Sequence, residues 1–187
     1  MPRCFSAFLC AALMAAPALA APAHEHGVAR LDVSLDGHAL TVGLDSPLDN
    51  LLGFEHAPTT EEQRAAVLVM TRRLREAAAV VVPNGQARCA LAEVHVASPV
   101  LAPAMLGEAE PVAAASVPHE PAGHADLEAS WRFDCVRPEA LRELRVGFFE
   151  TFAGFRLIRV QAVGPHGQAY AELTANAPVL EWKQAHD

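Results

Sequence analysis

Two short segments of the chain carry side chains that could together bind a divalent metal ion. His24 and His26 are separated by one residue near the start, and His119, His124 and Asp126 lie together much later. In an extended segment, residues i and i+2 point to the same side, so the first two histidines can offer two imidazoles to one ion. A tetrahedral site needs three or four N, O or S ligands. The second segment is therefore expected to complete the site.

These two segments each precede a stretch of alternating apolar and polar residues. If the two resulting strands lie side by side in one sheet, His26 and His124 would open at the same end. Glu55 and His56 form a second candidate metal site, because they follow an apolar connection. Solvated histidines, and for Glu55 and His56 loop packing or helix capping, are the alternatives that the spacing leaves open.

Two of the four cysteines, Cys89 and Cys135, lie outside the N-terminal segment. If the chain is exported to an oxidising compartment, an even pair of cysteines predicts one disulfide bond. A pair of thiolate metal ligands is the competing interpretation.

The N-terminus has the pattern of a secretory leader. Arg3 gives a short positive region, residues 4–16 are apolar, and Ala18-Leu19-Ala20 fits the small-x-small cleavage rule. We expect cleavage after residue 20, or as late as residue 23, and a periplasmic location. The apolar run is too short for a stable membrane span, so no membrane insertion is expected after removal of the leader.

Periodicity predicts mostly β-strands and one main helix in the rest of the chain. Alternation over 29–35 and 40–44 predicts a hairpin, and further strands are expected over 80–82, 90–96, 127–133, 144–149, 157–163 and 169–174. Thr60 with Gln63, or Thr59 with Glu62, forms a capping box before the helix. Val67, Met70, Leu74, Ala77 and Ala78 form its apolar stripe.

Residues 99–123 are rich in Pro, Ala, Glu and Gly and have no periodicity, which predicts an exposed, flexible insert. Residues 24–187 are therefore expected to form a single α+β domain. We expect a mostly antiparallel sheet with one main helix, short helical turns and one disulfide.

Composition and motifs exclude several functions. The chain has 22 acidic against 14 basic residues and a net charge of −8, without basic clusters, which argues against nucleic acid and anionic lipid as partners. No nucleophile elbow, His-Glu-x-x-His helix or glycine-rich phosphate loop is present. The sequence therefore predicts a protein that is not an enzyme.

Three blocks of the sequence resemble the ZrgA-like family of exported proteobacterial proteins, a domain of unknown function tied to zinc-regulated uptake. The blocks are residues 26–31, 45–58 and 123–135, and the most specific part is Gly-Phe-Glu-His-Ala-Pro at 53–58. The resemblance covers almost the whole chain after the leader. It implies a periplasmic zinc-binding role, with zinc as the bound metal and a zinc-uptake transporter as a partner.

Three functions remain open from the sequence. The first is a non-catalytic periplasmic protein that binds zinc and assists its uptake or homeostasis. The second is a periplasmic interaction module that binds no metal. The third is a metal-dependent hydrolase, although no general base is recognisable beside an open metal position.

Overall fold

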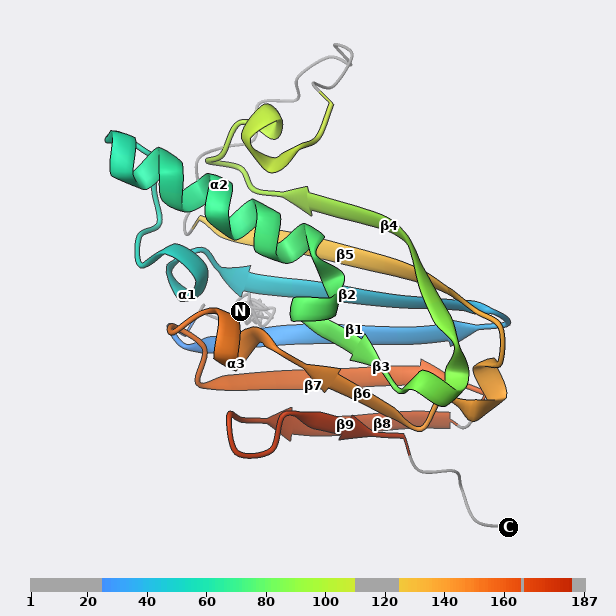
Figure 1. The fold of residues 1–187 in the computed structure, drawn as a ribbon. Helices are drawn as coiled ribbons and strands as arrows, with labels where there is room; N and C mark the ends of the chain where they lie inside the picture. Colours follow the sequence, from blue (N-terminus) through green and yellow to red (C-terminus); the bar gives the residue numbers. More distant parts are fainter. Residues whose placement is uncertain (1–24, 110–124, 166, 183–187) are drawn as a thin grey trace, which may run out of the picture.

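A computed structural model describes residues 25–109, 125–165 and 167–182 (Figure 1). The predicted leader and its predicted cleavage site lie outside these residues. The largest element is a six-stranded sheet with the strand order β4-β5-β2-β1-β7-β8. Its strands are β1 (Val28–Asp36), β2 (Ala39–Pro47), β4 (Cys89–Ala97), β5 (Asp126–Cys135), β7 (Leu157–Gly164) and β8 (Gly167–Leu173). All neighbours pair antiparallel except β1 and β7, which are parallel.

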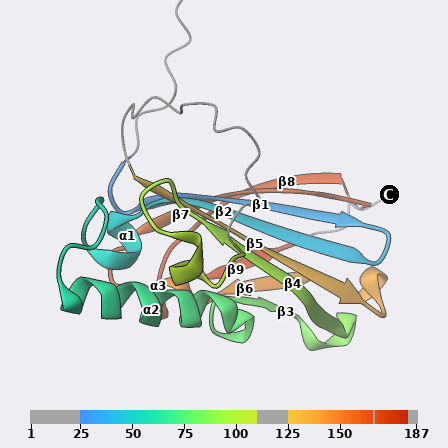
Figure 2. The same ribbon diagram turned by 90° about the horizontal axis from the view of Figure 1, so that it is seen from above.

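A second layer covers one face of this sheet. It contains the main helix α2 (Glu61–Arg75) and a small antiparallel sheet in the order β3-β6-β9, as Figure 2 shows from above. The small sheet is formed by β3 (Val81–Pro83), β6 (Glu143–Val146) and β9 (Val179–Glu181). Short helices connect the strands: α1 (Asp49–Leu52), η1 (Ala77–Ala79), η2 (Gly85–Ala87), η3 (Pro103–Leu106), η4 (Pro138–Ala140) and α3 (Phe148–Thr151). The predicted α+β class is confirmed.

The hydrophobic core lies between the two layers. Strand residues with the apolar phase, such as Leu31 and Val42, point inward and are fully buried, because successive side chains of a strand face opposite sides. Trp131 is also fully buried, and its indole N–H donates to the Leu74 carbonyl of α2 at 2.7 Å. Its ring lies 5.8 Å from that of Phe148. These contacts join the sheet to the second layer.

Helix α2 begins at one of the two predicted capping boxes. The Thr60 hydroxyl accepts from the Gln63 amide, and the Gln63 side chain accepts from the Thr60 amide. The helix ends at Arg75, so the predicted apolar stripe continues only through Ala77 in the following 3-10 turn. Ala78, which was predicted to lie on the stripe, is exposed because the chain has left the helical path.

Cys89 and Cys135 form the predicted disulfide. They are directly paired residues of β4 and β5, and the bond therefore closes the end of an antiparallel pair.

Ordered structure extends further into the predicted insert than the composition indicates. Leu101 and Leu106 are buried, and Arg75 donates two hydrogen bonds to the Leu106 carbonyl. The two leucines are separated by a segment with one proline and give no periodicity. Both are nevertheless buried, and η3, which contains Leu106, packs against α2 and β4. Residues 99–109 therefore pack against the fold, which differs from the prediction of an exposed insert, and residues 110–124 lie outside the described part.

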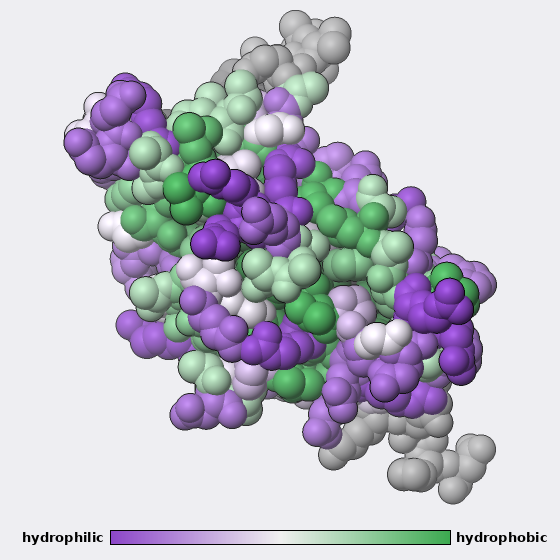
Figure 3. Space-filling model, viewed as in Figure 1, coloured by the Kyte–Doolittle hydropathy of each residue, from purple (hydrophilic) through white to green (hydrophobic). Residues whose placement is uncertain are grey.

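The face that carries α2 and the small sheet mixes hydrophobic and hydrophilic areas (Figure 3). Leu68 and Val69 are about half exposed on α2. None of the helices in the described ranges has both the length and the apolar character required to cross a membrane.

Candidate functional site

His26 lies between two carboxylates at one end of the six-stranded sheet. Its Nδ1 is 3.4 Å from Oδ2 of Asp49, and its Nε2 is 3.3 Å from Oε1 of Glu55. The imidazole is 58% exposed, whereas the Glu55 side chain is only 24% exposed. The Oε1 atom of Glu55 is itself buried and has no hydrogen-bond partner among the described residues. The described polar group near it is the His26 ring, whose position does not satisfy hydrogen-bond geometry.

Asn50 fixes the chain beside His26. It is almost completely buried, and its Oδ1 accepts from the Gly27 amide at 2.6 Å. Its Nδ2 donates to the Val28 carbonyl at 3.0 Å and to the Ser46 hydroxyl at 3.1 Å. One side chain from α1 therefore holds the start of β1 against the end of β2.

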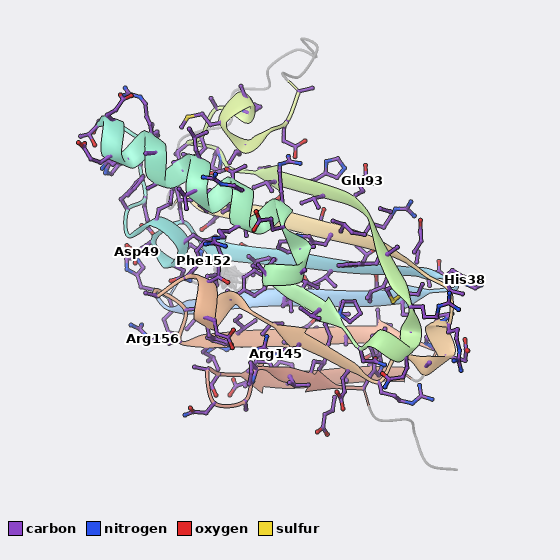
Figure 4. The ribbon with its side chains drawn as sticks, in the orientation of Figure 1. His38, Asp49, Glu93, Arg145, Phe152 and Arg156 are labelled. Atoms are coloured by element: carbon purple, nitrogen blue, oxygen red, sulfur yellow. A yellow bond between two sulfur atoms is a disulfide. The ribbon has the colours of Figure 1, made fainter. Side chains whose placement is uncertain are left out.

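A second element holds the same turn from the other side. Gly27 has a φ of +86°, a conformation that favours glycine, and a Cβ there would overlap the Arg156 guanidinium. Arg156 donates from its side chain to the His26 carbonyl and from its amide to the Gly27 carbonyl. Figure 4 shows Asp49 and Arg156 at the same end of the sheet, far from His38.

The start of β5 reaches the same end. Strands β1 and β5 flank β2, and both run antiparallel to it, so both begin where β2 ends. Pro47 pairs with Asp126, and the Leu48 amide donates to the Ala125 carbonyl at 2.9 Å. The prediction for His26 and His124 supposes that these two strands lie side by side. In the structure β2 lies between them, so they are two strand spacings apart, roughly 10 Å.

The structure describes only some of the predicted ligands. His24, His119 and His124 lie outside the described residues. Asp126 is half-buried at the first position of β5. Among the residues that are described, no group of three or more His, Cys, Asp or Glu side chains is arranged to hold a metal.

The geometry around His26 explains why the described residues there do not form a group of three metal ligands. Asp49 and Glu55 approach opposite nitrogens of one ring. An ion bound to either nitrogen would therefore have only one of the two carboxylates on its side. These described residues offer at most two ligands to one ion.

The second predicted pair divides between two environments. Glu55 faces His26, whereas the described contacts of His56 are with its own loop. The His56 Nδ1 is 2.9 Å from the Ala57 carbonyl, and its ring lies 5.1 Å from the ring of Phe54. Glu55 therefore links the second predicted site to the first, which the sequence treated as separate.

Sequence reasoning did not identify Asp49 as part of the site. Asp49 comes two residues after the end of β2, the strand that pairs with β5. This position indicates that Asp49 lies near the site only once the strand order of the sheet is known.

A second histidine also lies between two carboxylates, on the edge strand β4. The Nε2 of His95 is 2.8 Å from Glu93, and its Nδ1 is 3.5 Å from Glu108. The hydrogen bond to Glu93, followed by that to Glu108, raises the pKa of His95 above the ordinary value of 6.5.

Glu108 connects this histidine to the rest of the fold. Its Oε1 accepts from the Val96 amide at 3.0 Å and from the Arg75 guanidinium. Burial raises the pKa of Glu108, but these two hydrogen bonds and the charge of Arg75 outweigh it, so the pKa is lowered. Both carboxylates near His95 also have an arginine nearby, since Arg132 lies 3.9 Å from Glu93. The two arginines neutralise negative charge that would otherwise attract a metal cation to His95.

The fold and the site therefore define an α+β protein in which one end of a mixed sheet gathers nitrogen and oxygen ligands of the kind that zinc prefers. Residues 23–182 match the description "ZrgA family zinc uptake protein". The chain belongs to this family, as the sequence blocks predicted, and the membership indicates a role in zinc uptake. No curated protein matches the chain.

Proposed function

We propose that the protein binds zinc without catalysing a reaction, at the end of the six-stranded sheet where β1 and β5 begin. In this proposal it acts in the periplasm and supplies zinc to, or holds it for, an uptake transporter. The leader pattern and the disulfide support an oxidising exported location.

The observation that carries the proposal is the contact of His26 with Glu55 and Asp49. Imidazole nitrogen and carboxylate oxygen are both zinc ligands. His26 with one carboxylate supplies two ligands, and we propose that the rest come from His24, His119, His124 and Asp126. Asp126 begins the strand that starts at the same end of the sheet.

The buried oxygen of Glu55 supports a cation at this place. A carboxylate oxygen removed from water is unfavourable unless a positive charge or a donor compensates it. The His26 ring is the described group nearest to this oxygen, at 3.3 Å. Because zinc binds neutral imidazole, binding should weaken as the pH falls through the ordinary histidine range near 6.5.

The experiment is zinc titration of the tag-free mature protein, by calorimetry and by competition with a fluorescent chelator. We expect stoichiometric binding that His26→Ala and His124→Ala each weaken at least about tenfold, the effect of losing about 1.4 kcal/mol of binding free energy. Glu55→Gln should weaken binding while it preserves the shape of the side chain.

His95→Ala is the matched control, because His95 also lies between two carboxylates but on another strand. It should leave the affinity unchanged. Loss of binding in His95→Ala or His56→Ala, with normal binding in His26→Ala, would mean that the zinc site is elsewhere. Absence of any zinc binding would select the metal-free interaction module, and turnover of ester or phosphoester substrates by the zinc-loaded protein would select the hydrolase.

A further inference from the structure

The face of the six-stranded sheet opposite α2 has a hollow that crosses four strands. The hollow has a volume of about 660 Å³ and is lined by outward-facing residues of β1, β2, β7 and β8. Within the described part of the chain, no helix or strand covers this face (Figure 2). It is separate from His26, which lies at the end of the sheet.

The hollow exists because small residues occupy its floor and larger ones its rim. Gly43 lies in the floor, and a Cβ built there would meet only one atom within 4 Å, the Asp32 carbonyl oxygen at 3.9 Å. At the rim, Tyr170 is 61% exposed and Val163 is 50% exposed. Both side chains leave apolar surface exposed at the edge of the hollow.

This face of the sheet is also strongly acidic. The outward positions of β1, β2, β5, β7 and β8 carry seven carboxylates and only three arginines. A smaller hollow of about 290 Å³ adjoins the first one at Asp32 and Gly43, and it adds Asp45 and Glu128 to the lining. Asp32, Asp45 and Glu128 form no ion pair with a described residue. Of the arginines, Arg132 and Arg159 are each paired with two carboxylates.

The charge decides which occupant fits. A second copy presenting the same face would bring like charges together, and like-charge contacts at an interface are unfavourable. The undescribed segment 110–124 contains two glutamates and no Lys or Arg, so it does not complement the face either. A small cationic molecule would be poorly enclosed, because ligand sites bury most of their ligand and this hollow is open along the sheet.

We propose that the outer face of the six-stranded sheet docks a basic, partly apolar segment of a partner protein. Apolar side chains of that segment would lie over Gly43 against Tyr170 and Val163, and its Lys or Arg side chains would lie near Asp32, Asp45 and Glu128. Four strands at about 4.8 Å spacing are roughly 14 Å across, the length of four to five extended residues. This proposal is independent of zinc binding.

The test uses a synthetic peptide of alternating lysine and valine as the probe, and a peptide of alternating glutamate and valine as its acidic counterpart. Binding is followed by fluorescence anisotropy and mapped by NMR chemical shifts on the ¹⁵N-labelled protein. We expect saturable binding of the basic peptide, with shifts on β1, β2, β7 and β8, and affinity that falls with salt. Equal binding of the acidic peptide would overturn the proposal.

Gly43→Val fills the floor of the hollow, and valine is suited to a strand, so the variant should fold normally. We expect its affinity for the basic peptide to fall about tenfold or more. Gly85→Val is the matched control, since a Cβ there also has open space but lies in η2, away from the hollow. Asp32→Asn should weaken binding and reduce its salt dependence. If Gly43→Val binds as the unchanged protein does, or if concentrated protein self-associates through this face, the proposal is wrong.

Discussion

Replacing Asn50 by alanine is expected to lower the free energy of unfolding by roughly 2–4 kcal/mol. Asn50 is 1% exposed and makes three hydrogen bonds, to the Gly27 amide, the Val28 carbonyl and the Ser46 hydroxyl. Alanine removes all three hydrogen bonds.

The magnitude follows from the groups that would lose their partners. The Gly27 amide is buried, and an unsatisfied buried donor costs about 1–3 kcal/mol. The Val28 carbonyl is partly buried, so water replaces some of its hydrogen bond and the loss is about 1 kcal/mol. Ser46 retains its hydrogen bond to the Pro47 carbonyl and adds little.

Urea unfolding followed by circular dichroism measures the change, provided that the m-value stays constant. Asn84→Ala is the matched control. Asn84 also bonds several backbone groups, of Ala140, Arg142 and Glu143. Asn84 is only half-buried and its bonds to the Arg142 and Glu143 amides are exposed, so we expect a loss of only about 1 kcal/mol. A loss below 1 kcal/mol in Asn50→Ala, or equal losses in the two variants, would refute the reasoning about burial.

Two further predictions concern the disulfide and the edge strand. Reduction of Cys89–Cys135, which spans 46 residues, should lower the free energy of unfolding by up to about 4 kcal/mol, measured by urea unfolding with and without reductant; an unchanged midpoint would contradict this. Glu93→Gln should lower the pKa of His95 toward 6.5 in an NMR titration, because Glu93 is the main cause of the raised value. Since folding raises the pKa of His95, protonated His95 stabilises the folded protein. This contribution is fully present below about pH 6.5 and is lost as the pH rises through the pKa of His95 in the folded state. An unaltered His95 titration in Glu93→Gln would show that Glu93 does not control it.

Local patterns in the sequence were enough to predict the main helix and the six strands of the large sheet. They did not predict β9, and the strand predicted over 144–149 ends at Val146, before α3. Alternation identified the strands because it follows from the two-residue period of an extended chain with one buried face. The capping box at Thr60 and Gln63 marked the start of α2, since those side chains satisfy backbone groups only a few residues away. The disulfide followed from the number of cysteines and the leader pattern.

The insert shows where local patterns fail. Leu101 and Leu106 are buried, and the Leu106 carbonyl is bound by Arg75 of α2, 31 residues earlier, so no periodic signal marks them. Composition contained no information about packing, and it gave no sign of η3.

Tertiary structure alone decided the composition of the candidate site. His26, Asp49 and Glu55 meet because β1 pairs with β2, and α1 then returns the chain to the start of β1. The parallel pairing of β1 with β7 adds Arg156 to the same turn. Residue types predicted which side chains could bind a metal, whereas strand order and register determined which of them are neighbours, because those depend on how the whole core packs and not on any local spacing.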